Sequence, residues 1–182
     1  GAGADLWSRT GRGDLSGRFA RLARLPRADW GKGTAHAGLG ITIFAVAALM
    51  GWQSEDIRVV QIGEGFEKGG YTLTLRSVER VQGPNFVSTM ATIDATRDGR
   101  LITTLTPERR FYPIAGMPTT EAAIDYKIHR DLYVTLGDAQ DNGGWAIRTY
   151  IKPFANWLWF GCFLMALGGI ISLTDRRFRV AA

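Results

Sequence analysis

The stretch GTAHAGLGITIFAVAALMGWQS, residues 33–54, decides the fold, because His36 is its only ionisable side chain. As an α-helix, these 22 residues would extend about 33 Å, enough to cross the hydrocarbon core of a bilayer. A second uncharged run of 22 residues, PFANWLWFGCFLMALGGIISLT, occupies positions 153–174. We therefore predict two transmembrane helices, at 33–54 and 153–174, separated by a domain of 98 residues at 55–152.

Charge is distributed unevenly along the chain and indicates how the chain is oriented. Residues 1–32 hold seven basic and three acidic side chains, residues 55–152 hold 12 and 13, and residues 175–182 hold three and one. Basic flanks of a span stay on the cytoplasmic side. We expect a multi-pass protein of a bacterial inner (cytoplasmic) membrane, with both ends of this chain cytoplasmic and the middle domain periplasmic. The same bias accounts for a pI near 9.7, so no nucleic-acid partner is expected.

The segment before the first run has features of a membrane-surface region. Trp30 and Trp52 bracket the first run at the spacing of interfacial anchors. Residues 14–25, DLSGRFARLARL, place apolar side chains at helical spacing among arginines. They predict a basic amphipathic helix, either on the lipid surface or solvated in the cytoplasm. Residues 1–12 do not resemble a signal peptide, so we expect the chain to be a piece of a longer multi-span protein.

The domain at 55–152 has the alternation of an antiparallel β domain. Residues 71–82 alternate throughout, which predicts one strand with Leu73 and Ser77 on one face and Val78 on the other.

Turn dipeptides divide this domain into strands. Asp98-Gly99 and Asn142-Gly143 each stand between strand-like runs, and such dipeptides are strong hairpin signals. Residues 121–126 are compatible with a strand or a short helix. We expect about six short strands in a barrel or a sandwich. The fold class is thus a membrane protein of α+β type, with two transmembrane helices flanking a small antiparallel β domain.

His36 is the leading candidate for a functional residue. A polar ring within hydrocarbon needs a partner, so an ionisable residue there indicates function. Its neighbours on the same helical face include Gly33 and Gly40, which leave a flat recess beside the ring. From the residues alone three roles stay open: axial ligand of the iron of a flat macrocycle such as haem, proton relay, or polar group in helix packing. Lying four residues beyond Lys32, the ring would be about 6 Å inside the charged boundary.

Other candidate residues are weaker. The only other histidine, His129, lies in the middle domain, where we expect a surface side chain. If His36 ligates a six-coordinate haem, the second axial ligand must therefore come from outside this chain. The single cysteine, Cys162, is expected to fill space within the second span. That span also carries small residues that predict helix–helix packing: Gly161, Gly168, Gly169 and Ser172.

Five blocks of sequence resemble one known family. In chain order they are DWGKGTAHAGLG (29–40), GMPTTEAAI (116–124), RDLYVTLGD (130–138), WAIRTYIKPFANWLWFG (145–161) and ALGGIISLTDRR (166–177). Together they are similar to the C-terminal part of CcmF proteins, the haem lyase components of bacterial cytochrome c maturation. The related NrfE proteins share this pattern.

The resemblance implies a cofactor and partners. CcmF proteins carry a b-type haem between two transmembrane histidines, and the one in the AHxG block corresponds to His36. Gly33 and Gly40 would then lie beside that haem. The implied partners are the rest of the CcmF chain, the haem chaperone CcmE, apocytochrome-handling proteins of the CcmH and CcmI type, apocytochrome c and membrane lipid. Haem delivered by CcmE is attached to apocytochrome c in the periplasm.

The chain lacks parts that this family uses for ligation. Trp157-Leu158-Trp159 is not the family's tryptophan-rich WWD motif, and His129 matches no ligand of the family. No catalytic residue is therefore assigned, and we do not expect this chain to attach haem alone. The alternative function is a membrane-anchored β domain that acts only as a docking scaffold in a membrane complex, with His36 in a packing role.

Overall fold

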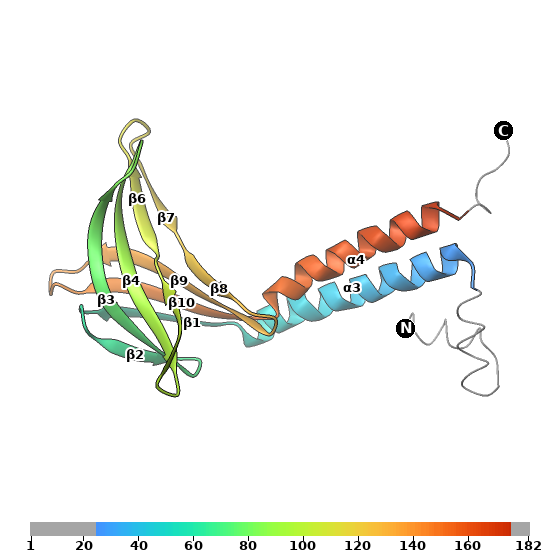
Figure 1. Ribbon diagram of the computed structural model, residues 1–182, viewed down its shortest axis with the longest axis horizontal. Helices are drawn as coiled ribbons and strands as arrows, with labels where there is room; N and C mark the ends of the chain where they lie inside the picture. Colours follow the sequence, from blue (N-terminus) through green and yellow to red (C-terminus); the bar gives the residue numbers. More distant parts are fainter. Residues whose placement is uncertain (1–24, 176–182) are drawn as a thin grey trace. The chain divides into compact units, whose positions relative to one another are not determined.

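The structure is a computed structural model that describes residues 25–175. These residues form two compact units: the pair of helices, and residues 51–153 (Figure 1). The basic amphipathic helix expected at 14–25 lies outside the described residues.

The helical unit consists of α3 (Arg27–Trp52, 26 residues) and α4 (Ala155–Leu173, 19 residues). At 1.5 Å per residue they extend about 39 Å and 28 Å, and both are long and apolar enough to cross a bilayer. Helix α3 begins directly after Pro26, whose carbonyl accepts hydrogen bonds from the backbone N–H groups of Asp29 and Trp30. The residue before α4, Phe154, has a φ of 54°, which ends the preceding strand conformation.

The second unit is an antiparallel β-sandwich, and the expectation of two apolar helices flanking such a domain is confirmed. One sheet has four strands, in the order β1 (Ser54–Val60), β10 (Trp145–Pro153), β9 (Arg130–Ala139) and β8 (Ala123–Tyr126). The other has six, β2 (Gly65–Lys68), β3 (Tyr71–Gln82), β4 (Val87–Arg97), β6 (Glu108–Tyr112) and β7 (Met117–Glu121), with β5 (Arg100–Leu105) also paired to β4. Figure 1 shows the long, curved strands β3 and β4 of this second sheet.

The core fills the space between the two sheets. Its members are apolar side chains at alternate positions of the longer strands: Val60, Phe66, Tyr71, Leu73, Leu75, Ala91, Ile93, Ala95, Leu105, Leu132, Val134, Leu136 and Ile147. Burying a large aliphatic side chain contributes about 1.5–3 kcal/mol, so this cluster supplies most of the attraction between the sheets.

Both predicted hairpins are confirmed. Asp98 and Gly99 have φ angles of 50° and 73° between the paired residues Arg97 and Arg100, as in a two-residue type I′ turn. The turn at Asn142-Gly143 is one residue longer than such a turn. There Gln140 and Gly144 form the closing pair, and Gly143 has a φ of 79°.

The face assignment along residues 71–82 is correct only for the first half of β3. Leu73 and Leu75 are fully buried, but the pairing with β4 shifts between Leu75 and Ser77. The extra residue, Arg76, forms a β-bulge, and a bulge moves the following side chains to opposite faces. As a result Val78, not Ser77, packs against the core.

The sandwich has more strands than the six expected. Strands β5 and β6 both pair with β4 and are separated by Thr106 and the buried Pro107. The sequence pattern indicated the strand before this interruption but not its continuation as β6. Strands β2 and β7 are four and five residues long, too short for a clear alternation. The ambiguous residues 121–126 are strand: the end of β7 followed by β8.

A buried polar cluster ties the two sheets together. Arg130 of β9 donates hydrogen bonds from Nη1 to Asp125 Oδ2 of β8 (2.7 Å) and from Nε to the Tyr71 hydroxyl of β3 (3.0 Å). Its guanidinium carbon also lies 4.5 Å from the centroid of the Tyr71 ring. Because the Arg130 side chain is only 6% exposed, these bonds act away from bulk water, where they are stronger.

Candidate functional site

The candidate site is built on α3, whose orientation is set by close packing against α4. A Cβ atom added to Gly38 would lie 2.6 Å from the carbonyl oxygen of Gly161, and one added to Gly168 would lie 2.6 Å from that of Gly31. Real Cβ atoms do not approach oxygen so closely, so the backbones of α3 and α4 are in contact at both glycine pairs. Small residues permit this approach in membrane helix pairs.

The predicted packing side of α4 is confirmed with one exception. Gly161 and Gly168 both contact the backbone of α3, and the backbone of Ser172 lies against Gly31. A Cβ at Gly169, in contrast, would meet nothing within 4 Å. Gly169 therefore does not belong to the packing face, because it is displaced by roughly 100° around the helix from Gly168.

His36 faces away from α4. Helix α3 turns by about 100° per residue, so His36 lies roughly 140° around the axis from Gly31, whereas Gly38 lies within about 20° of it. In agreement, Gly31 and Gly38 are buried and His36 is exposed. The imidazole ring therefore does not contribute to the packing of α3 on α4.

One ring nitrogen of His36 has a fixed partner. Nδ1 lies 2.8 Å from the backbone carbonyl oxygen of Lys32, one helical turn earlier. A carbonyl only accepts hydrogen bonds, so Nδ1 carries the proton in a neutral ring. Nε2 then carries the lone pair. Histidines that ligate metals show this arrangement, in which the hydrogen bond fixes the tautomer and the ring orientation.

The surface beside His36 is apolar and open on one side. Gly40 is exposed, and a Cβ there would meet nothing within 4 Å. Leu39 and Ile43 are 47% and 61% exposed. Gly33 has a similar helical phase to Gly40 but is buried, so the open surface lies on the Gly40 side of the ring. Such a surface leaves room beside the imidazole for a flat, mostly apolar ligand.

His129 is exposed in the turn between β8 and β9, as expected for a surface side chain. Cys162 is a partly buried free thiol in α4. Within residues 25–175, no group of three or more His, Cys, Asp or Glu side chains has the arrangement of a metal site.

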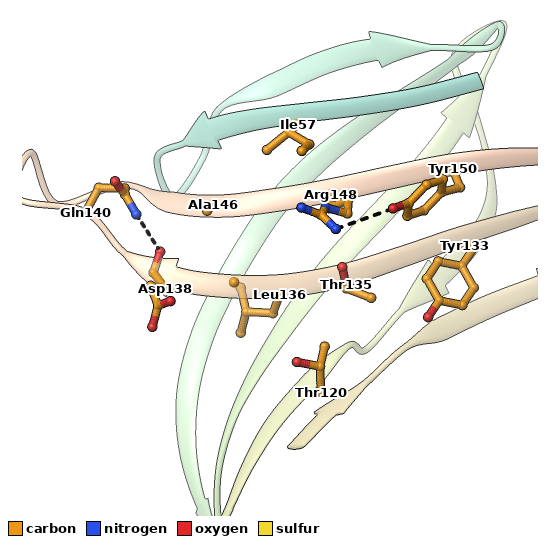
Figure 2. A pocket seen from close by; sticks show the side chains of 11 residues that line it. Ile57, Thr120, Tyr133, Thr135, Leu136, Asp138, Gln140, Ala146, Arg148 and Tyr150 are labelled. Atoms are coloured by element: carbon orange, nitrogen blue, oxygen red, sulfur yellow. Dashed lines mark hydrogen bonds between the residues drawn. The ribbon is translucent and has the colours of Figure 1, made fainter. Parts of the chain in front are cut away.

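The β-sandwich carries a groove that the sequence did not reveal. Its volume is about 470 Å³, and Figure 2 shows its lining side chains along β1, β9, β10 and β7. Gly137 and Ala146 lie side by side at the bottom of the groove and are small, since a Cβ at Gly137 would lie 3.1 Å from that of Ala146. Alternation along the strands around Asn142-Gly143 was the signal that could have placed these residues on one outer face.

Aromatic and charged side chains form one end of this groove. The rings of Tyr133 and Tyr150 pack edge to face with centroids 5.6 Å apart, and Lys152 Nζ lies 4.3 Å from the Tyr133 centroid. The Tyr150 hydroxyl donates a hydrogen bond to Glu55 (2.9 Å), and Arg148 Nε lies 3.4 Å from the same carboxylate. Tyrosine and arginine are frequent in protein interfaces.

The fold and the histidine face together define a class of protein: a β-sandwich inserted between two helices that are apolar enough to cross a membrane, one of which presents an outward histidine. Residues 51–153 match the family model described as CcmF C-terminal beta-sandwich. The chain belongs to this family, as the five sequence blocks had indicated.

Curated relatives agree with this assignment. The chain is 57% identical over its whole length to "Cytochrome c-type biogenesis protein ccl1" of Rhodobacter capsulatus, 27% of which it covers. It is 44% identical over 89% of its length to "Cytochrome c-type biogenesis protein CcmF" of Escherichia coli, covering 25% of that protein. It is 32% identical over 78% of its length to "Cytochrome c-type biogenesis protein NrfE" of Haemophilus influenzae, covering 22% of that protein. The chain thus spans about a quarter of the length of these relatives.

A solved structure has the same fold. The chain superposes on "Cytochrome c Heme Lyase CcmF" with a TM-score of 0.68 and 20% identity, covering 88% of this chain and 28% of that one. At this identity the match establishes the arrangement of helices and strands alone.

Proposed function

We propose that the chain is the C-terminal part of a haem lyase component of cytochrome c biogenesis, and that His36 is one axial ligand of a b-type haem within the membrane. The observation that carries this proposal is the His36 ring itself. Its Nδ1 is bound to the Lys32 carbonyl at 2.8 Å, which leaves Nε2 as the nitrogen that could ligate iron, on an exposed ring on the same helix face as the open position Gly40. A haem bound there would supply electron transfer, and the second axial ligand would come from outside this chain.

The residues of α3 would hold the haem in defined ways. The Lys32 carbonyl keeps the His36 ring in one tautomer and, by accepting the hydrogen bond from Nδ1–H, makes Nε2 a stronger ligand. Gly40 leaves room for the edge of the macrocycle, and Ile43 offers it an apolar contact. Gly33, although buried, adds no side chain at the position three residues before His36.

The proposal includes the orientation in the membrane. We infer an inner-membrane location, with spans at 33–54 and 153–174, the segments 1–32 and 175–182 in the cytoplasm, and the sandwich at 55–152 in the periplasm. The basic residues of the flanks support this orientation. The proposed partners are the rest of the parent chain, CcmE, CcmH- and CcmI-type proteins and apocytochrome c, so that haem is attached on the periplasmic side.

The experiment that tests the ligand uses the full-length parent protein with His36→Ala, and with His129→Ala as a matched control. His129 is the only other histidine in this chain and is exposed in a turn. We expect His36→Ala to abolish the low-spin b-type absorbance spectrum and His129→Ala to preserve it. An unchanged spectrum in His36→Ala would overturn the proposal.

A second candidate function, a docking scaffold, is favoured by the groove on the sandwich. The residues along it combine the small Gly137 at the bottom with tyrosines and a half-exposed arginine, Arg148. In this function Gly137→Leu, which fills the bottom of the groove, would prevent capture of an apocytochrome or CcmH-type partner by the parent protein while bound haem is retained. Unchanged capture in pull-down measurements would exclude the groove as the docking surface.

A further inference from the structure

Asp175, two residues after the end of α4, is hydrogen-bonded to the start of α3. Its Oδ2 accepts a hydrogen bond of 2.9 Å from the backbone N–H of Ala28, the second residue of α3. N–H groups in the first turn of a helix have no partner within the helix, and a negative charge there is favoured by the helix dipole. Asp175 is only 6% exposed, so this bond is shielded from water.

The glycine contacts fix how α3 lies along α4. Gly31 meets Gly168, and Gly38 meets Gly161; in each helix the two positions are seven residues apart, or about two turns. Sliding α3 by one residue would force a larger side chain into a backbone contact. His36 lies between Gly31 and Gly38 in the sequence, so these two glycine contacts fix its position along the axis of α4.

Asp175 acts on the same part of α3 that orients the imidazole. Ala28 is one turn before Lys32, and the Lys32 carbonyl holds His36 Nδ1 one turn further on. The first turn of a helix frays easily unless it is capped. Without the hydrogen bond that Ala28 donates to Asp175, this turn would lose the contact that links it to the end of α4, and the Pro26 carbonyl and the packing of Gly31 would remain.

We propose that Asp175 is a positioning residue for His36: by capping α3 from the end of α4, it fixes the position and rotation of the imidazole presented to the haem. This inference rests on the proposed haem ligation by His36. Asp175 itself does not contact the cofactor.

The test uses the full-length parent protein and two pairs of matched variants. Asp175→Ala removes the acceptor, whereas Asp175→Asn removes the charge but keeps an oxygen that can accept from Ala28. Gly168→Ala places a Cβ 2.6 Å from the Gly31 carbonyl oxygen, whereas Gly169→Ala meets nothing within 4 Å. Haem content, the low-spin electron paramagnetic resonance signal and the midpoint potential are measured for all four and for His36→Ala.

The expected result separates the members of each pair. Asp175→Ala and Gly168→Ala should retain haem on the order of tenfold more weakly, the range seen when ligand-orienting groups are removed, and should broaden or split the low-spin signal. Asp175→Asn and Gly169→Ala should resemble the wild type. Gly168→Ala tests the alignment of the two helices separately. If Asp175→Ala fails to fold, Asp175→Asn carries the test, because loss of the wild-type signal in that variant would contradict the hydrogen-bonding role of Asp175.

Two results would overturn the positioning role of Asp175. One is a wild-type signal in Asp175→Ala while His36→Ala loses the haem, which would leave the proposed function intact. The other is equal damage by Asp175→Asn and Asp175→Ala, which would show that the hydrogen bond to Ala28 is not the cause. A wild-type signal in His36→Ala would instead remove the ligand proposal, and the positioning role with it.

Discussion

Replacing Arg130 by alanine should destabilise the β-sandwich strongly, because the side chain joins three strands from both sheets. Its guanidinium donates to the Asp125 carboxylate (2.7 Å), to the Asp125 carbonyl (2.9 Å) and to the Tyr71 hydroxyl (3.0 Å). The side chains of Arg130 and Asp125 are 6% and 11% exposed. Arg130→Ala would leave the carboxylate and the hydroxyl buried without this donor.

Removing one partner of a buried ion pair costs about 3–5 kcal/mol. Lys127 Nζ lies 3.5 Å from the other oxygen of Asp125 and can partly compensate, so we expect a loss near the lower limit, about 3 kcal/mol. For a domain of this size, 1 kcal/mol corresponds to roughly 4–8 °C in Tm. The Tm of the sandwich should therefore fall by about 12–24 °C.

The assay is thermal and urea unfolding of the whole chain in detergent, followed by near-ultraviolet circular dichroism. Arg148→Ala is the matched control, because Arg148 is 52% exposed and pairs with Glu55 at the surface. It should lower the free energy of unfolding by less than about 1 kcal/mol. A loss of the same small size for Arg130→Ala would refute the assignment of Arg130 as the link between the sheets.

Three further predictions follow from single contacts. Gly99→Ala should lower the unfolding free energy by about 1–2 kcal/mol in the same assay, since Gly99 has a φ of 73°; no loss would contradict the type I′ turn. Hydrogen bonding by Arg76 lowers the pKa of Asp94 below its usual 3.8, so the ion pair stabilises above that pH and is lost as pH falls through the lowered pKa. Arg76→Ala should destabilise slightly at pH 7, with the difference vanishing at low pH, and a constant difference from pH 7 to 2 would contradict this. Gly40→Leu should leave the fold intact but exclude haem from the His36 face, and a normal haem spectrum would contradict that fit.

Much of the architecture was predictable because it depends on local patterns. Uncharged runs of bilayer length can be recognised directly, and the turns at Asp98-Gly99 and Asn142-Gly143 need residues that accept positive φ. The alternation that buries Leu73 is equally local. The bulge at Arg76 was not predictable, because an extra residue in one strand becomes visible only when the partner strand is known.

The candidate site divides in the same way. A histidine within an uncharged run identified His36, and its spacing from Gly40 identified the open surface beside it. The contact that links the start of α3, the helix of His36, to the end of α4 was not predictable. The hydrogen bond that the Ala28 N–H donates to Asp175 joins residues 147 positions apart, and no periodicity in the sequence links them.

Axial ligation by His36 is the central claim, and replacing the ligand by a free one tests it most directly. In the full-length parent protein, His36→Gly removes the imidazole and leaves a space beside Gly40, which is already open. We predict that this variant loses the low-spin b-type spectrum, and that added imidazole restores the spectrum until the space is filled. A His36→Gly protein that keeps its low-spin spectrum without imidazole would contradict it.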